Sequence, residues 1–270
     1  MRISVVDAFT DRPFAGNPAG VCRLESAADP AWMQAVAAEM KHSETAFVRP
    51  ADDGDADFEL RWFTPETEVD LCGHATLATA HVLFDEGVAA PVRFGTRSGV
   101  LTVDRDADGV IGMDFPAHPA QETQPVPGLA EALGAEVRWT GRSRFDVLAA
   151  VHDEQTVRRL APDVDALTRV DARGIIVTAA ADEAGTDFVS RFFAPRVGVP
   201  EDPVTGSAHC VLAPYWAWAL GRADGHAMTG RQLSSRGGTV RTTMHGDRVR
   251  LAGRAVTVVD GQLDGGAAHG

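Results

Sequence analysis

Several residue types and motifs on which cofactors depend are scarce or absent in this sequence. Lys41 is the only lysine among 25 basic residues, so a Schiff base or a pyridoxal phosphate linkage has a single possible anchor. The three cysteines, Cys22, Cys72 and Cys210, are widely spaced, which fits neither a disulfide framework nor a zinc cluster. No Walker loop, glycine-rich dinucleotide turn or His-Glu-x-x-His motif occurs. We therefore expect reduced thiols, no cofactor and no metal.

Basic clusters and long apolar runs are also missing. The formal net charge is −13, and nucleic acids and anionic lipids attract proteins through clustered Lys and Arg. The N-terminus reaches Asp7 after only a few apolar residues, so it lacks the core of a signal peptide, and no later segment has membrane-spanning length. We expect a cytoplasmic protein that binds neither nucleic acid nor membranes.

Alternating apolar and polar residues predict antiparallel strands in the first part of the chain. These runs lie at residues 3–9, 58–62, 100–102 and 111–115. Asp29 and Pro30 are typical of an N-cap and a first helical turn, and the apolar positions that follow predict an amphipathic helix ending near Met40. A second helix is expected from His74 to Phe84, and its apolar residues on almost every side predict burial.

An internal repeat relates residues 61–65, Arg-Trp-Phe-Thr-Pro, to residues 191–195, Arg-Phe-Phe-Ala-Pro. Each is followed by a loop, a glycine and an apolar helix. The second of these helices covers 211–220, and Pro214 is expected to kink or interrupt it. The repeat predicts an α+β fold with two pseudo-symmetric halves, each a curved, mostly antiparallel sheet or barrel around a central helix.

We place the two halves at 1–117 and 118–270, with the boundary in a proline-rich stretch. The glycine-rich end of the chain, 265–270, is expected to form a frayed tail.

The two glycines of the repeat, Gly73 and Gly206, each open a buried helix. Free N–H groups and the positive end of the helix dipole make such a terminus suitable for a carboxylate or phosphate. If pseudo-symmetry brings the two termini face to face, they form one cleft. The alternative is that each glycine only permits a tight turn between strand and helix.

Four polar residues are candidates for acid and base chemistry. Glu44 stands where a helix is followed by a strand, a position from which a carboxylate can enter a cleft and move a proton. Asp202 is a possible partner carboxylate, although Asp-Pro also opens turns. His74 and Ser207 occupy equivalent positions in the repeat and can each donate a hydrogen bond.

Cys72 permits two interpretations. A cysteine at a helix N-terminus can be an activated thiolate, but it can also be a small packing residue. Its counterpart in the repeat is Thr205, and a racemase that uses two opposed thiols needs one on each face of its substrate. The substitution therefore argues against that mechanism. Cys22 and Cys210 are expected in the core, and Asn17 in a turn.

The motifs together resemble the PhzF family, which contains the phenazine-biosynthesis isomerases and many relatives of unassigned function. The matching segments are 7–10, 14–19, 43–48, 63–65, 72–76 and 201–208. The resemblance implies a diaminopimelate-epimerase-like fold, an active site between the two halves and a homodimer. It also implies a cofactor-independent isomerase, in which a glutamate moves a proton within trans-2,3-dihydro-3-hydroxyanthranilate or a related small carboxylate.

Carried onto this sequence, the resemblance implies catalytic roles for four residues and substrate binding by six more. The catalytic residues are Glu44, His74, Asp202 and Ser207, and the binding residues are Asn17, Ser43, Cys72, Gly73, Thr205 and Gly206. The residues before Gly73, Leu71 and Cys72, follow the broader branch of the family and leave the substrate open. Two alternatives stay open: an amino-acid epimerase or dehydratase that uses Cys72, and a non-catalytic binding protein on the same fold.

Overall fold

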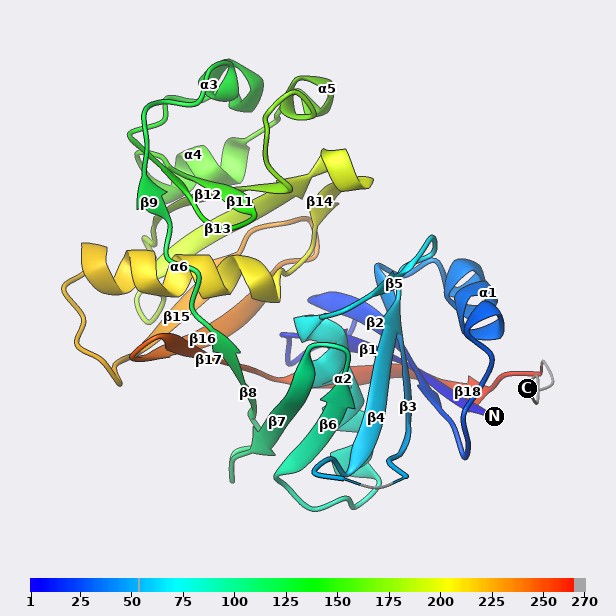
Figure 1. Ribbon diagram of the computed structural model, residues 1–270. Coiled ribbons are helices and arrows are strands. Elements are labelled where there is room, and N and C mark those ends of the chain that lie inside the picture. The colour runs from blue at the N-terminus through cyan, green and yellow to red at the C-terminus, as the bar shows by residue number, and fades with distance from the viewer. Residues whose placement is uncertain (53, 265–270) are drawn as a thin grey trace. The chain divides into compact units, whose positions relative to one another are not determined.

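The chain folds into two compact units in the computed structural model, which describes residues 1–52 and 54–264 (Figure 1). Unit 1 comprises Met1–Asp114 and the C-terminal segment from Ala252, and unit 2 comprises Phe115–Leu251. The tail expected at 265–270 lies outside the described residues. No helix in the described part of the chain has the length and apolar character needed to cross a membrane.

One domain boundary predicted from the sequence is wrong. The second half was expected to extend over 118–270, yet the last strand, β18 (Ala255–Gln262), pairs antiparallel with the first, β1 (Arg2–Ala8). Backbone hydrogen bonding to β1 therefore places the C-terminal strand in unit 1. A contiguous division cannot account for a chain whose two ends pair with each other.

Unit 1 is a mixed sheet with one buried helix. Besides β1 and β18, its elements are β2 (Asn17–Arg23), α1 (Pro30–Met40), β3 (Glu44–Pro50), β4 (Phe58–Phe63), β5 (Glu68–Val69), α2 (Gly73–Asp85), β6 (Val92–Thr96), β7 (Gly99–Arg105) and β8 (Ile111–Pro116). The pairing is antiparallel for β1–β2, parallel for β2–β3, antiparallel for β3–β4 and β4–β5, parallel for β4–β6 and antiparallel for β6–β7.

Unit 2 repeats this pattern. Its elements are β9 (Gln121–Glu122), α3 (Leu129–Leu133), β10 (Trp139–Arg142), β11 (Asp146–Ala150), α4 (Glu154–Arg159), α5 (Val164–Leu167), β12 (Gly174–Ala180), β13 (Phe188–Ala194), η1 (Pro195–Val197), β14 (Val199–Asp202), α6 (Gly206–Ala219), β15 (Ala227–Gln232), β16 (Gly238–His245) and β17 (Arg248–Gly253). Strand β10 pairs with β11, β11 with β12, β12 with β13, β13 with β14 and β15, and β15 with β16, in the same sequence of antiparallel and parallel pairs as unit 1. The pairings confirm the duplication.

Local sequence explains the helices of unit 1. Asp29 caps α1, because its side chain accepts a hydrogen bond of 3.0 Å from the backbone N–H of Ala31. Helix α2 contacts β1, β2, β3 and β18, and nearly all of its side chains from His74 to Phe84 are buried. Both helices lie where the sequence predicts them, and α2 is the central helix of its unit.

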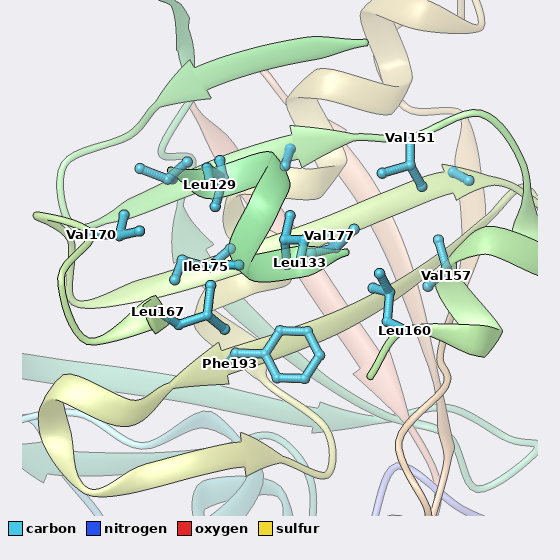
Figure 2. Packing of buried hydrophobic residues seen from close by; sticks show 14 of the residues in the cluster. Leu129, Leu133, Val151, Val157, Leu160, Leu167, Val170, Ile175, Val177 and Phe193 are labelled. Carbon is cyan, nitrogen blue, oxygen red and sulfur yellow. The ribbon is translucent and has the colours of Figure 1, made fainter. Parts of the chain in front are cut away.

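In unit 2, the strands β11, β12 and β13 carry helices on both faces (Figure 1). Side chains alternate across a strand, so Val147 and Ala149 of β11 pack with α3, α4 and α5, while Leu148 packs with α6. Figure 2 shows the first of these two clusters, in which Phe193 and Leu133 are among the residues buried. The second cluster, on the opposite face of the sheet, contains the buried apolar side chains of α6.

Pro214 does not interrupt α6, which continues from Gly206 to Ala219. A proline inside a helix leaves the carbonyl four residues earlier without its N–H partner. Here that carbonyl belongs to Cys210, and it accepts a hydrogen bond of 2.9 Å from the backbone N–H of His118. An external donor thus satisfies the acceptor that Pro214 leaves unpaired within the helix.

Candidate active site

Glu44 and His74 lie together in unit 1. Glu44 begins β3 and His74 is the second residue of α2, and the Nε2 atom of His74 is 3.4 Å from Oε2 of Glu44. The His74 side chain is 6% exposed and that of Glu44 19%, so the carboxylate is the more accessible of the two. Among the described residues, Nε2 of His74 has no partner with hydrogen-bond geometry. A buried N–H beside a partly accessible carboxylate suits transfer of a proton to or from a ligand.

The surroundings of the other ring nitrogen fix the tautomer of His74. The amide Nδ2 of Asn17 lies 3.3 Å from Nδ1, and the sulfur of Cys72 lies 3.5 Å from the same atom. The Asn17 amide nitrogen is a donor only and a thiol is a weak donor, so Nδ1 accepts. The proton of the neutral ring is therefore on Nε2, which faces Glu44.

Burial keeps His74 neutral. It lowers the pKa of this imidazole to about 3, with a smaller contribution from repulsion by His42. The contact between His74 and Glu44 is therefore one between a neutral imidazole and a carboxyl group. Near neutral pH the ring is therefore uncharged, and its Nε2–H is available as a hydrogen-bond donor.

The loop before Asn17 has an unusual backbone. Phe14 has φ of 65°, in the left-handed region, and Gly16 has the same value. A Cβ atom on Gly16 would lie 2.1 Å from the carbonyl oxygen of Ala8, so only glycine fits there. Asp7 closes the loop, since its Oδ2 accepts a hydrogen bond of 2.7 Å from the N–H of Phe14. This loop delivers the fully buried Asn17 to His74.

The two helices that open at a glycine, like the short helix α3, have no side-chain cap at the N-terminus. Asp29, Asp153 and Asp163 cap α1, α4 and α5 through their side chains, whereas no side chain caps α2 or α6. Neither Gly73 nor Gly206 has a positive φ, so a left-handed turn is not what requires glycine at these positions. Uncapped first-turn N–H groups of long helices suit an anionic ligand. Ser43 is half-buried directly before β3.

In unit 2, Asp202 and Thr205 belong to one hydrogen-bonded loop. The hydroxyl of Thr205 donates to Oδ2 of Asp202 at 2.5 Å, so this hydroxyl is not used to cap α6. Gln232, which is buried in β15, accepts from the N–H of Thr205 at 3.0 Å and donates to the carbonyl of Asp202 at 2.7 Å. Gln232 is a positioning residue that was not identified from the sequence.

Ser207 is half-buried at the start of α6 and contacts a basic residue. The Nη2 atom of Arg173 donates to Oγ of Ser207 at 3.1 Å. Arg173 also holds the buried Asp146 through two hydrogen bonds of 2.9 and 2.6 Å. Arg173 precedes β12 and was not identified from the sequence.

The internal repeat also preserves an ion pair. Arg61 donates to both carboxylate oxygens of Glu68 at 2.7 Å, and Arg191 donates to both oxygens of Glu201 at 2.7 and 2.9 Å. Each glutamate lies five residues before the glycine that opens the next helix, Gly73 or Gly206. Such two-point contacts have defined geometry, and in both units they fix the strand that leads to the helix.

One cluster has the composition of a metal site. Ligand atoms of Glu44, Cys72 and His74 lie within 4.8 Å of one another. Carboxylate, thiolate and imidazole are all zinc ligands. However, Cys72 contacts Nδ1 of the His74 ring, while Glu44 lies beside Nε2. The thiol and the carboxylate therefore lie next to different ring nitrogens, whereas a metal ion would be bound by only one of them. The arrangement favours a proton-transfer pair over a coordination sphere.

Cys22 and Cys210 are buried, as expected, and burial raises the pKa of Cys22 to about 12. Cys72 is also buried, at 7% exposure, and its sulfur lies 3.5 Å from Nδ1 of His74. The Cys72 thiol thus lies against the His74 ring of the candidate site.

The two units have matched strand pairing, and each contains a helix that opens at a glycine beside polar side chains. These features define an α+β protein of the epimerase fold. The crystal structure of a hydroxyproline epimerase from Agrobacterium vitis, solved with bound trans-4-hydroxy-L-proline, shares this fold. Its TM-score is 0.63 at 13% identity, with 97% of this chain and 92% of that chain covered.

The model of the PhzC-PhzF family, described as phenazine biosynthesis-like protein, matches residues 6–261, and the chain belongs to this family. An uncharacterized isomerase of Halalkalibacterium halodurans is 48% identical over 265 residues, which is 97% of either chain. A PhzF family protein from Enterococcus faecalis has a crystal structure with a TM-score of 0.90 at 40% identity, covering 97% of this chain and 98% of that one. Relatives named as isomerases thus span nearly the whole length.

Proposed function

We propose that this protein is a cofactor-independent isomerase that moves a proton within a small carboxylated substrate. The observation that carries the proposal is the 3.4 Å contact between Glu44 and the Nε2 atom of a buried, neutral His74. Glu44 is the more accessible partner, and it takes the proton from a carbon atom of the substrate and returns it to another atom of the same molecule. The reaction has no net change in protons or electrons and needs no co-reactant.

His74 has a supporting role in this reaction. Its Nε2–H donates a hydrogen bond to the substrate oxygen on which negative charge develops, and such a preorganised donor lowers the barrier. Asn17 maintains the required tautomer by donating to Nδ1. The sulfur of Cys72 contacts the same nitrogen.

The carboxylate of the substrate is proposed to bind at an uncapped helix N-terminus, for which Gly73 of α2 and Gly206 of α6 are the candidates. Ser43 and Thr205 are further proposed binding residues. Asp202 and Ser207 are further proposed catalytic residues, as the family resemblance implies. The substrate itself is proposed to be trans-2,3-dihydro-3-hydroxyanthranilate or a related metabolite. We further propose a homodimer, which light scattering of the purified protein tests.

Isotope exchange tests the role of Glu44. The protein is incubated in deuterium oxide with dihydro-hydroxyanthranilate and its analogues, and proton NMR follows deuterium incorporation. We expect Glu44→Gln to lower the exchange rate 10²- to 10⁴-fold, the range typical of a lost general base. Glu66→Gln is the matched control, because Glu66 is an exposed glutamate of the same unit. Equal exchange by wild type and Glu44→Gln would overturn the assignment.

An epimerase that uses Cys72 is the second candidate, favoured by the 3.5 Å contact between its sulfur and His74. Cys72→Ala distinguishes the two functions, because it abolishes activity only if the thiol carries the proton. Treatment with EDTA distinguishes both from a metal mechanism at the Glu44, Cys72 and His74 cluster. We expect exchange to survive EDTA and to be retained largely in Cys72→Ala. A non-catalytic binding protein would instead show thermal stabilisation by ligands without any turnover.

A further inference from the structure

Unit 2 contains a cavity of about 480 Å³ that is lined by four arginines. The arginines are Arg142, Arg144, Arg173 and Arg196. They come together because the end of β10, the start of β12 and the end of β13 lie at the same end of the sheet. Segments up to 54 residues apart in the chain thus supply cations to one cavity, which the sequence motifs did not indicate.

Only part of this positive charge is neutralised by the cavity's own carboxylates. Asp146 pairs with Arg173, and Asp171 pairs with Arg196 at 3.0 Å. Arg142 donates to the carbonyl oxygen of Asp171 at 2.7 Å. Arg144 has no ion pair with a carboxylate of the described residues. Four cations against two anions give a local excess of positive charge in a chain whose net charge is −13, and that excess attracts anionic ligands.

An aromatic ring forms one wall beside these cations. Phe145 is 44% exposed, and the guanidinium carbons of Arg144 and Arg173 lie 4.9 and 5.3 Å from the centre of its ring. Stacking on the ring holds both guanidinium groups while leaving N–H donors at their edges. Val197, which is 58% exposed, adds a second apolar surface to the lining. The cavity therefore suits an anionic group attached to a flat or apolar body.

Arg173 connects the cavity to the start of α6, since it donates to Oγ of Ser207 at 3.1 Å. We propose that the arginine cavity binds a second anionic group of the substrate, a carboxylate or a phosphate, beyond a first carboxylate at the N-terminus of α6. The substrate is then a dianion with a flat or apolar body, and Arg144 and Arg173 determine this specificity. This inference rests on the proposed function, in which Ser207 acts on the substrate.

Isothermal titration with small anions tests the cavity without turnover. The probes are benzoate, isophthalate, terephthalate and 4-phosphonobenzoate, so that the second group is absent, a carboxylate or a phosphonate. We expect the better dicarboxylate to bind at least tenfold more tightly than benzoate, because a charge-assisted hydrogen bond to arginine is added. The affinities of terephthalate and 4-phosphonobenzoate show whether the cavity binds a carboxylate or a phosphonate more tightly. Equal affinity of benzoate and all three dianions would overturn the proposal.

Arg144→Ala is the informative variant, because removal of the Arg144 side chain leaves no buried carboxylate without its ion-pair partner. It should lower the affinity for the dianion to about that of benzoate and leave benzoate binding unchanged. Arg138→Ala is the matched control, because Arg138 is an exposed arginine of unit 2 that does not line the cavity. Arg173→Lys keeps the charge opposite Asp146 but loses the two-point geometry, and an intermediate loss is expected.

The two proposals fail separately. Unchanged dianion affinity in Arg144→Ala overturns the cavity assignment, whatever Glu44 does. Equal deuterium exchange by wild type and Glu44→Gln overturns the proposed function, while the titration, which is repeated with Glu44→Gln, still reports on the cavity.

Discussion

The protonated nitrogen of His74 faces a carboxylate oxygen of Glu44 at 3.4 Å, and the ring is neutral because burial lowers its pKa to about 3. A neutral donor beside a general base divides the work between the two residues. In the proposed reaction, Glu44 carries the proton, while His74 stabilises charge on the substrate without itself changing protonation state.

His74→Phe removes the donor and keeps a ring of similar size. We expect kcat to fall about 10²-fold, the typical effect of losing one preorganised donor, with a smaller change in KM. His74→Gln retains an amide N–H and should recover part of the loss. Because the pKa of His74 is about 3, the pH–rate profile should show no limb near pH 6.5. A limb at that pH that disappears in His74→Phe would contradict the neutral-donor role.

Gly16→Ala should disturb the loop that holds Asn17. The new Cβ atom would meet the carbonyl oxygen of Ala8 at 2.1 Å, and φ of +65° is itself unfavourable for alanine. Together these effects should cost about 1–3 kcal/mol of unfolding free energy and lower kcat through displacement of Asn17. Urea denaturation and steady-state kinetics measure both.

Gly87→Ala is the control for Gly16→Ala. Gly87 also has a positive φ, of 92°, but no atom lies within 4 Å of its added Cβ. Its substitution should cost about 1–2 kcal/mol and leave kcat unchanged. Equal kcat for the two variants would show that the loop does not position the site.

Local chemistry made much of the fold predictable. The cap at Asp29, the apolar sequence of α2 and the repeated Arg-Phe-Phe-like segments each determine a structure within a few residues, and all three are found. The place of β18 was not predictable in this way, because its partner β1 lies at the opposite end of the chain. Pro214 was misjudged in part, because the donor that permits a continuous helix comes from a distant segment.

The candidate site was likewise predictable from the sequence only in part. Glu44 and His74 are recognisable from their motifs, and the structure places them in contact. Gln232 and Arg173 act through partners 27 and 34 residues away, and such contacts depend on which strands pair rather than on neighbouring residues. Residues of this kind leave no local pattern in a single sequence.

Gln232→Leu should release the loop that contains Asp202 and Thr205. The buried N–H of Thr205 loses its acceptor, and an unsatisfied buried donor costs about 1–3 kcal/mol. Because the loop is proposed to bind the substrate, we expect KM to rise about tenfold and kcat to change less. Gln232→Glu is the matched control, since a carboxylate still accepts from Thr205 but no longer donates to the carbonyl of Asp202, and its effect should be intermediate. Wild-type KM in Gln232→Leu would remove Gln232 from the positioning residues.

His209 should make folding sensitive to acid. It is fully buried in α6, where its Nδ1–H donates to the carbonyl of Thr205 at 2.8 Å; Thr76 makes the equivalent contact to Cys72 at 2.6 Å in unit 1. Burial lowers the pKa of His209 from 6.5 to about 4, despite the opposing effect of that hydrogen bond. Between these two values the unfolded chain binds the proton and the folded chain does not. Stability is therefore complete above pH 6.5 and is lost as the pH falls toward 4.

The expected slope is up to about 1.4 kcal/mol per pH unit for each such histidine, and His74, with a pKa of about 3, adds to it over a wider range. His209→Asn retains a donor near the position of Nδ1 but cannot be protonated, so it should flatten the dependence of unfolding free energy on pH between 6.5 and 4. His226→Asn, at an exposed position of the same unit, should leave the slope unchanged. Urea denaturation at pH 7.5, 6, 5 and 4.5 measures the slopes, and identical curves for wild type and His209→Asn would show that His209 accepts its proton equally well in the folded state.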